Sequence, residues 1–201
     1  MRRRNLLIGL LAVVIAGVVV ESVAHPLHVT RSSRRPLQRA TVSLIGDSLN
    51  LGVEPYLEAE LSGWTIDTDD VVGRSTETGV DHLRAQGTAL GHYVIVSLGT
   101  NDPSTAVAAF RTNVADVMRR AGGRCVVWAT IHRDGDAYAL FNDVLRAEAD
   151  ANRGLRLVEW TSMLDAHPEW LAADGIHATA GGYRARAAAI VSAMRGCPRA
   201  E

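Results

Sequence analysis

Val42-Ser43-Leu44-Ile45-Gly46-Asp47-Ser48-Leu49 is an apolar run of strand length that ends on a glycine, an acid and a serine. Open α/β sheets bind ligands beyond the carboxyl ends of their strands, so a strand that breaks at Gly46 delivers the Ser48 hydroxyl where a ligand binds. A serine in this position can also act only as the cap of the next helix. The stretch therefore predicts a strand followed by a ligand-facing serine, with a helix cap as the alternative.

Apolar runs of strand length alternate with helical patterns from Ala40 onward. The strand candidates are residues 41–45, 64–68, 93–98, 125–129 and 155–160. The third and fourth are nearly continuous Val/Ile runs, which is typical of parallel strands buried on both faces. Helical patterns cover 104–121, the region around Phe141, Val144 and Leu145, and 183–194, where Thr179 is a candidate N-cap. This alternation predicts an α/β fold, a three-layer α/β/α sandwich around a five-stranded parallel sheet.

Polar and glycine clusters recur just beyond the carboxyl ends of these strands. They are Gly46–Leu49, Val72–Ser75 and Gly99–Asp102 after the first three strands, and Asp174–His177 between the fifth strand and the final helix. Because the loops at this edge of a doubly wound sheet converge, we expect the four clusters to meet. Each cluster alone could be an ordinary turn, whereas their convergence predicts a functional site.

In this order and spacing, the four clusters resemble the conserved blocks of the SGNH hydrolases, also called the GDSL esterase/lipase family. The match runs from Thr41 to about Met194 and implies the flavodoxin-like SGNH hydrolase fold. The final third, with Glu159-Trp160, Pro168-Glu169-Trp170 and the Asp174 cluster, resembles SGNH domains attached to cell-wall O-acetyltransferases. Those domains usually carry Asp-Trp where this chain has Glu159-Trp160.

The resemblance implies a catalytic role for three side chains. Ser48 is expected to be the nucleophile, and His177 the base that takes its proton and later protonates the leaving alkoxide. Asp174, three residues before His177, can accept the other imidazole N–H and so fix the tautomer. Asp47 is expected to shape the turn rather than to transfer protons.

The same resemblance assigns donors for the oxyanion of a tetrahedral intermediate. They are the backbone N–H groups of Ser48 and Gly73 and the side chain of Asn101. Losing one such donor typically lowers turnover by about 10²- to 10³-fold.

Composition narrows the choice of partners and cofactors. The net charge is −1, so nothing indicates a nucleic-acid partner, and all 21 basic residues are arginine. Without lysine, a Walker A loop and Schiff-base chemistry are excluded. Cys125 and Cys197 form no Cys/His cluster, so neither a metal nor a cofactor is expected; they could form a disulfide in an exported domain or remain free thiols.

The amino-terminal segment indicates export. Arg2-Arg3-Arg4 precedes an uncharged apolar stretch over 5–20, and Ser22-Val23-Ala24 fits a signal-peptidase site. We expect residues 1–24 to be a cleaved signal peptide or a retained membrane anchor, 25–39 a linker and 40–201 the SGNH hydrolase domain. The domain is then secreted or membrane-anchored and extracytoplasmic, with membrane contact only through this segment, and is expected to be a monomer.

These observations favour an exported serine esterase that hydrolyses short, acetyl-like O-acyl esters. Short loops and an aromatic content of 5% argue against a large lipid-binding lid, and the cell-wall-like final third indicates a glycan carrier. Three alternatives remain: a lipase or thioesterase on lipid acyl esters, an O-acyltransferase with the same three side chains, and an inactive domain that binds glycan or protein. The G-x-S-x-G elbow of α/β-hydrolases is absent from the sequence.

Overall fold

A five-stranded parallel sheet organises the described part of the chain, as predicted. The computed structural model describes residues 41–86, 89–133 and 138–197, and its strand order is β2-β1-β3-β4-β5. The strands are β1 (Thr41–Gly46), β2 (Thr65–Asp70), β3 (Tyr93–Ser97), β4 (Cys125–Ala129) and β5 (Leu155–Val158). The helices are α1 (Ser48–Glu60), α2 (Thr76–Gln86), α3 (Val107–Ala121), α4 (Ala139–Ala151), α5 (Trp160–Ala166) and α6 (Ala180–Arg195), with a 3₁₀ turn at Pro168–Trp170.

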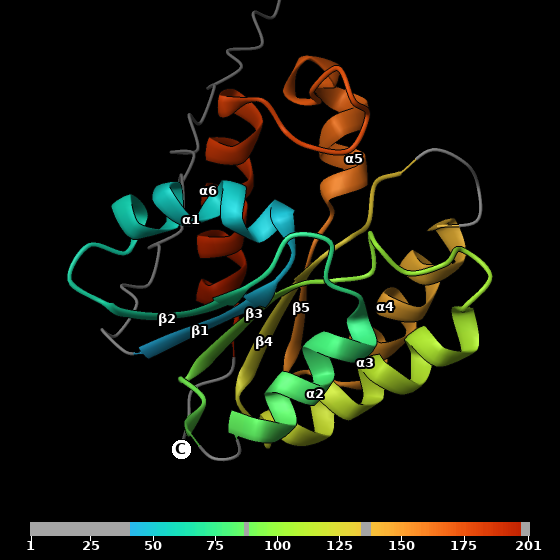
Figure 1. The fold of residues 1–201 in the computed structure, drawn as a ribbon. Helices are drawn as coiled ribbons and strands as arrows, with labels where there is room; N and C mark the ends of the chain where they lie inside the picture. Colours follow the sequence, from blue (N-terminus) through green and yellow to red (C-terminus); the bar gives the residue numbers. More distant parts are fainter. Residues whose placement is uncertain (1–40, 87–88, 134–137, 198–201) are drawn as a thin grey trace, which may run out of the picture. The chain divides into compact units, whose positions relative to one another are not determined.

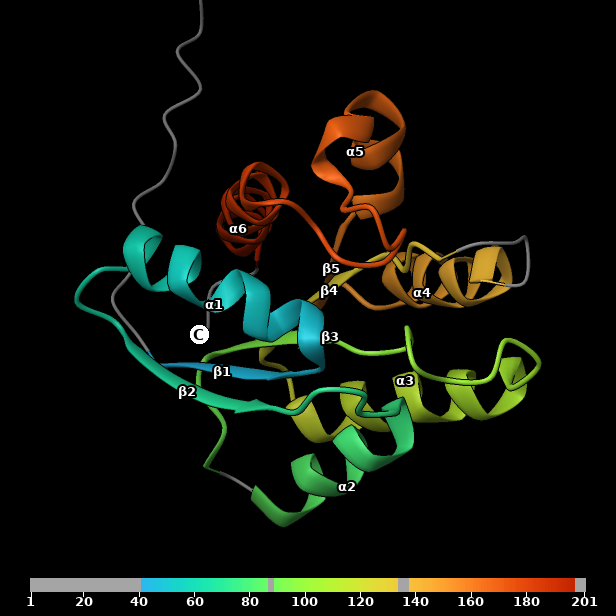
Figure 2. The same ribbon diagram turned by 45° about the horizontal axis from the view of Figure 1, so that its top comes forward.

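The helices cover both faces of the sheet, which gives the three expected layers (Figures 1 and 2). α1 and α6 lie on one face, and α2, α3 and α4 lie on the other. Side chains alternate between two apolar cores: Leu44 and Ile95 pack in the core under α1 and α6, whereas Ile45, Val94 and Val96 pack in the core under α2–α4. This period of two on buried strands explains their continuous apolar sequence.

Four predicted boundaries were wrong by two or three residues, and one of them is the start of α6, which lies at Ala180 rather than at 183. β2 starts at Thr65 and extends to Asp70, because it pairs with β1 along its whole length up to Gly46. β5 ends at Val158, and Trp160 instead begins α5, where its ring is buried. The helix expected from 104 begins at Val107. Thr179 caps α6 as predicted, accepting a hydrogen bond from the N–H of Gly182.

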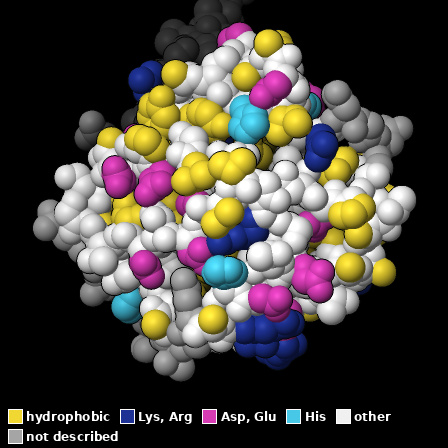
Figure 3. Space-filling model, viewed as in Figure 1, with side chains coloured by type: hydrophobic (Ala, Val, Ile, Leu, Met, Phe, Trp, Pro, Cys, Tyr) yellow, Lys and Arg dark blue, Asp and Glu magenta, His cyan; other side chains and the backbone are white. Residues whose placement is uncertain are grey.

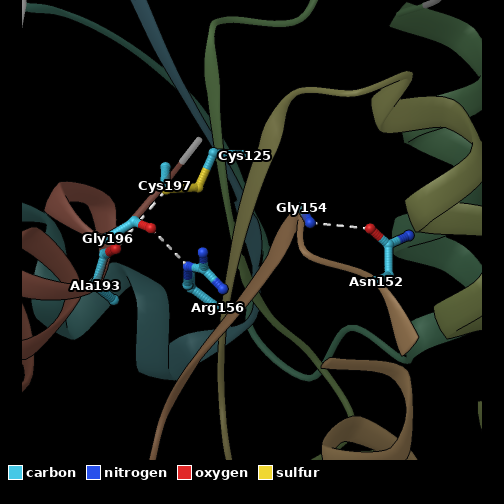
Figure 4. The surroundings of a disulfide bond; sticks show 7 residues. All are labelled: Cys125, Asn152, Gly154, Arg156, Ala193, Gly196 and Cys197. Atoms are coloured by element: carbon cyan, nitrogen blue, oxygen red, sulfur yellow. Dashed lines mark hydrogen bonds between the residues drawn. A yellow bond between two sulfur atoms is a disulfide. The ribbon is translucent and has the colours of Figure 1, made fainter. Parts of the chain in front are cut away.

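Cys125 and Cys197 form a disulfide, which decides between the two alternatives left open by the sequence (Figure 4). Their Cα atoms are 5.8 Å apart, and the bond ties Cys197, two residues after the end of α6, to the first residue of β4. Arg156 reinforces this junction by donating from Nε to the carbonyl oxygen of Gly196 at 2.9 Å. The bridge lies at the amino-terminal edge of the sheet, opposite the edge where the polar clusters lie.

The expected signal or anchor segment (1–24) and linker (25–39) lie outside the described residues. Among the described residues, none of the helices has the length and hydropathy needed to cross a membrane.

Candidate active site

Ser48 is the first residue of α1, and only Asp47 separates it from the end of β1. The helix cap is Asp47, whose Oδ1 accepts the backbone N–H of Leu49 at 3.0 Å. The alternative in which Ser48 is only a cap is therefore wrong, and the expectation that Asp47 shapes the turn is confirmed. Because the neighbouring carboxylate caps the helix, the Ser48 hydroxyl is free to contact a side chain from elsewhere in the chain.

That side chain is His177, from the loop that precedes α6. His177 Nε2 lies 2.9 Å from Ser48 Oγ, and His177 Nδ1 lies 2.7 Å from Asp174 Oδ2. The other carboxylate oxygen, Oδ1, accepts the backbone N–H groups of Ile176 at 3.0 Å and of His177 at 2.9 Å. Asp174 thus holds its own loop in shape and orients the imidazole toward Ser48.

These hydrogen bonds hold Asp174 in its ionised form. The contact with the His177 side chain, followed by the N–H groups of Ile176 and His177, lowers the pKa of Asp174 to about 2. An ionised Asp174 accepts a hydrogen bond from the Nδ1–H group of His177, which leaves Nε2 with a lone pair for the Ser48 O–H. The side chains of Asp174 and His177 are 51% and 39% exposed, so water reaches this edge.

Gly73 lies in the loop between β2 and α2. Its φ of +75° is a conformation that favours glycine, and a Cβ there would meet no protein atom within 4 Å, so open space lies beside its backbone. A shallow hollow of about 330 Å³ adjoins it, lined by Val71, Val72, Gly73, Arg74, Ser75, Thr78 and His82. The hollow lies beside the Gly73 loop, and Ser48, Asn101 and His177 are not among the residues that line it.

Asn101 joins the first three clusters together. Its Nδ2 donates to Asp47 Oδ2 at 2.9 Å and to the carbonyl oxygen of Arg74 at 3.2 Å. A side-chain amide has two N–H donors, and both have protein acceptors here. Asn101 lies where the resemblance implies an oxyanion donor, but one of these contacts must open before it can bind substrate oxygen.

Two further residues that support this edge were missed by sequence reasoning. Asp102 Oδ1 accepts the backbone N–H of Thr76 at 2.7 Å and so fixes the start of α2 against the loop after β3. Arg186, on α6, is 2% exposed and donates to Ser97 Oγ at 2.8 Å. Asp102 belongs to the Gly99–Asp102 cluster, so the sequence already indicated its position. Arg186 has no sequence feature that distinguishes it from an exposed helical arginine.

Glu159, which stands where similar domains carry Asp, has a partner of its own. Its carboxylate accepts from Arg146 Nη2 at 2.9 Å and from Arg146 Nε at 3.3 Å. The longer side chain reaches α4 rather than the site. Among residues 41–86, 89–133 and 138–197, no three His, Cys, Asp or Glu side chains are grouped to hold a metal ion.

No protein-family model matches this chain. Among curated proteins, it is 25% identical over 168 residues to O-acetyltransferase OatA of Staphylococcus aureus, covering 82% of this chain and 27% of that protein. It is 28% identical over 156 residues to peptidoglycan O-acetyltransferase OatA of Listeria monocytogenes, covering 75% of this chain and 23% of that protein. The chain thus spans about a quarter of the length of these relatives.

Solved structures share its fold at lower identity. The C-terminal catalytic domain of peptidoglycan O-acetyltransferase A of Streptococcus pneumoniae, solved with a methylsulfonyl adduct, superposes with a TM-score of 0.65 at 19% identity, covering 80% of this chain and 94% of that one. A lipase/acylhydrolase of Enterococcus faecalis gives a TM-score of 0.67 at 21% identity, covering 79% and 96%. The resemblance to SGNH hydrolases and to cell-wall O-acetyltransferases is confirmed, and the chain has the SGNH hydrolase fold.

Proposed function

We propose that this domain is a serine-dependent enzyme that cleaves short, acetyl-like O-acyl esters carried by cell-wall glycan outside the cytoplasm. One observation carries the proposal: a single imidazole contacts a carboxylate through Nδ1 and a serine hydroxyl through Nε2. This is the arrangement that activates a serine nucleophile. The lipase/acylhydrolase and the O-acetyltransferase domain among the solved structures support the same class of enzyme.

In the first half-reaction, Ser48 Oγ attacks the acyl carbonyl carbon while its proton moves to His177 Nε2. Asp174 stabilises the imidazolium that forms, since it is already ionised and 2.7 Å from Nδ1. His177 then gives the proton to the departing alkoxide oxygen, and the acyl group remains on Ser48 as an ester. These reaction steps need no metal or cofactor.

The oxyanion of the tetrahedral intermediate is assigned to three donors: the N–H groups of Ser48 and Gly73 and the Asn101 amide. Ser48 stands at the start of α1, whose first turn carries no acidic residue, so the helix dipole also favours negative charge there. The longer contact of Asn101, 3.2 Å to the Arg74 carbonyl, is the one we expect the substrate oxygen to replace.

In the second half-reaction, water attacks the acyl-enzyme with His177 as base. The exposure of Asp174 and His177 supports hydrolysis, because water has access to the acylated serine. Transfer to a sugar hydroxyl is the second candidate function, and the curated relatives named O-acetyltransferases favour it. The two reactions differ only in the hydroxyl group that accepts the acyl group.

A glycan carrier is favoured over a lipid by the surface around the site. On the face shown in Figure 3, hydrophobic side chains are interspersed with acidic and basic ones. Val71 and Val72, 50% and 72% exposed, border the hollow beside Gly73 together with Ser75 and Thr78. A small apolar wall with hydroxyl groups beside it suits a short acyl group on a sugar better than a long acyl chain.

The experiment is a chain-length series on the purified protein, with p-nitrophenyl esters from acetyl to octanoyl and an acetylated glycan, and with Ser48→Ala as the control. We expect kcat/KM to fall as the acyl chain lengthens, and acetate to be released from the glycan. A rising trend would support a lipid substrate instead, and absence of all turnover would support an inactive binding domain. Adding an unacetylated glycan and measuring acetylated product separates transfer from hydrolysis.

A further inference from the structure

Arg186 is a buried cation directly behind the candidate site. Its Nη2 donates to Ser97 Oγ at 2.8 Å, and its guanidinium lies over the Trp160 ring with 5.3 Å between Cζ and the ring centroid. Nε and Nη1 have no protein acceptor within the described residues, although both atoms are buried. A buried guanidinium with unpaired donors costs stability, so packing alone gives no reason for an arginine here.

Ser97, the last residue of β3, connects Arg186 to the serine loop. Its side chain accepts from Arg186, and its carbonyl oxygen accepts the backbone N–H of Asp47 at 3.1 Å. Asp47 is fully buried, and its carboxylate holds both the Leu49 N–H and the Asn101 amide. The guanidinium therefore reaches the loops of Ser48 and Asn101 through one residue.

The charges explain what an arginine adds. Burial raises the pKa of Asp47, and the positive charge of Arg186 is the largest opposing charge effect. An ionised Asp47 orients Asn101, yet its negative charge close to Asn101 also opposes the oxyanion that Asn101 is proposed to bind. The buried cation Arg186 lowers the pKa of Asp47, so it partly offsets the effect of burial and favours the ionised carboxylate.

We propose that Arg186 is a positioning residue, which acts through Ser97 and Asp47 to keep the Asn101 amide oriented and the oxyanion site free of uncompensated negative charge. The proposal rests on the proposed function. It assigns Arg186 no contact with substrate.

The test compares wild type, Arg186→Met, Asp47→Asn and the double variant in p-nitrophenyl acetate hydrolysis. We expect Arg186→Met to lower kcat by about 10- to 100-fold with little change in KM, below the loss that follows removal of an oxyanion donor. The Asp47→Asn variant has no carboxylate at this position that needs a counter-charge. In that background, Arg186→Met should therefore lower kcat by less than about threefold. Equal losses in both backgrounds would overturn the proposal.

Dependence on pH separates this role from a merely structural one. The charged and titratable groups that act on Asp47 are Arg186 and Tyr183 from α6, His177 before it and Asp70 at the end of β2. Losing the cation raises the pKa of Asp47 further. The acidic limb of the profile of kcat against pH should therefore move to higher pH in Arg186→Met, and it should return to its wild-type position in the double variant. A limb that stays in place in all variants would contradict the proposal.

Two more variants keep the outcome interpretable. Ser97→Ala removes the hydrogen bond from Arg186 but keeps the charge of Arg186. This variant should lose less kcat than Arg186→Met, and an equal loss of kcat would overturn the charge effect. If Arg186→Met does not fold, Arg186→Lys, which retains the charge, should keep more activity than Arg186→Gln, and the reverse order would contradict the proposal. An active Ser48→Ala variant would instead overturn the proposed function, whereas an inactive Ser48→Ala beside a fully active Arg186→Met overturns only the role of Arg186.

Discussion

His177 Nε2 lies 2.9 Å from Ser48 Oγ, although 129 residues separate the two in sequence. The sheet produces this contact, because Ser48 follows β1 and His177 precedes α6, which packs beside α1 on the same face (Figures 1 and 2). A local hydrogen bond from Asp174 completes the arrangement. The proposed chemistry depends on this long-range contact and on that local one.

Replacing Asp174 by Asn tests the local contact. The amide retains an oxygen for the N–H groups of Ile176 and His177 but cannot stabilise an imidazolium, so kcat should fall by about 10²- to 10⁴-fold. Steady-state kinetics with circular dichroism as a check on folding measure this. Asp165→Asn, at an exposed position on α5, is the matched control and should keep full activity. A fully active Asp174→Asn variant would remove Asp174 from the mechanism.

Asp70 should make stability depend on pH. Burial raises its pKa from an ordinary 3.8 to about 6, so the folded state holds this proton more tightly than the unfolded state. Its contribution is then fully present below about pH 4 and is lost as pH rises through 6. Asp70→Asn should raise stability at pH 7 by roughly 1 to 3 kcal/mol and change it little at pH 4.

The Asn50 contact supports the sign of this effect. Asn50 Nδ2 donates to Asp70 Oδ1 at 3.0 Å, while Asn50 Oδ1 and Asp70 Oδ2 are buried without a partner. A protonated Asp70, or an asparagine there, supplies a donor for the free oxygen of Asn50. Thermal unfolding at pH 4 and pH 7 measures the difference, with the exposed Asp67→Asn on the same strand as control. Destabilisation by Asp70→Asn at pH 7 would contradict the account.

The disulfide should contribute to stability and not to turnover. It closes a loop across a sequence separation of 72, which corresponds to about 4 kcal/mol in the chain-entropy model. The Cys125→Ala/Cys197→Ala variant should therefore melt at a lower temperature and keep its kcat at temperatures where it is folded, because the bridge lies at the opposite edge of the sheet. An unchanged melting temperature, or a lost kcat in the folded variant, would contradict this.

Chelation should leave turnover unchanged. The proposed steps use only Ser48, His177, Asp174 and the oxyanion donors. Hydrolysis of p-nitrophenyl acetate after dialysis against EDTA should match the untreated rate. Strong inhibition that added divalent metal reverses would show that a metal ion takes part.

The central strands and the polar clusters could be predicted because their signals are local. Val94, Ile95 and Val96 are buried on both faces and read as a continuous apolar run. The Asp-x-x-His spacing of Asp174 and His177 likewise produces a contact within one loop. The end of β5 was harder, since Trp160 continues the apolar run but its ring packs under Arg186 instead of extending the strand.

The supporting contacts could not be predicted, because they depend on which distant side chains the sheet brings together. The hydrogen bond between Asn101 and Asp47 joins positions 54 residues apart, and the one between Arg186 and Ser97 joins positions 89 apart. A buried arginine on a helix has the same sequence appearance as an exposed one. The sequence indicated where Asn101 lies. It did not indicate that the side-chain amide of Asn101 already donates hydrogen bonds to Asp47 and to the Arg74 carbonyl.

Covalent labelling of Ser48 tests whether His177 activates this hydroxyl as a nucleophile. The purified protein is treated with methylsulfonyl fluoride and digested, and the modified residue is identified by mass spectrometry in wild type, Ser48→Ala and His177→Ala. We expect a single modified serine, Ser48, whose labelling is lost in Ser48→Ala and at least about 100-fold slower in His177→Ala. Labelling elsewhere, or at an unchanged rate without His177, would contradict it.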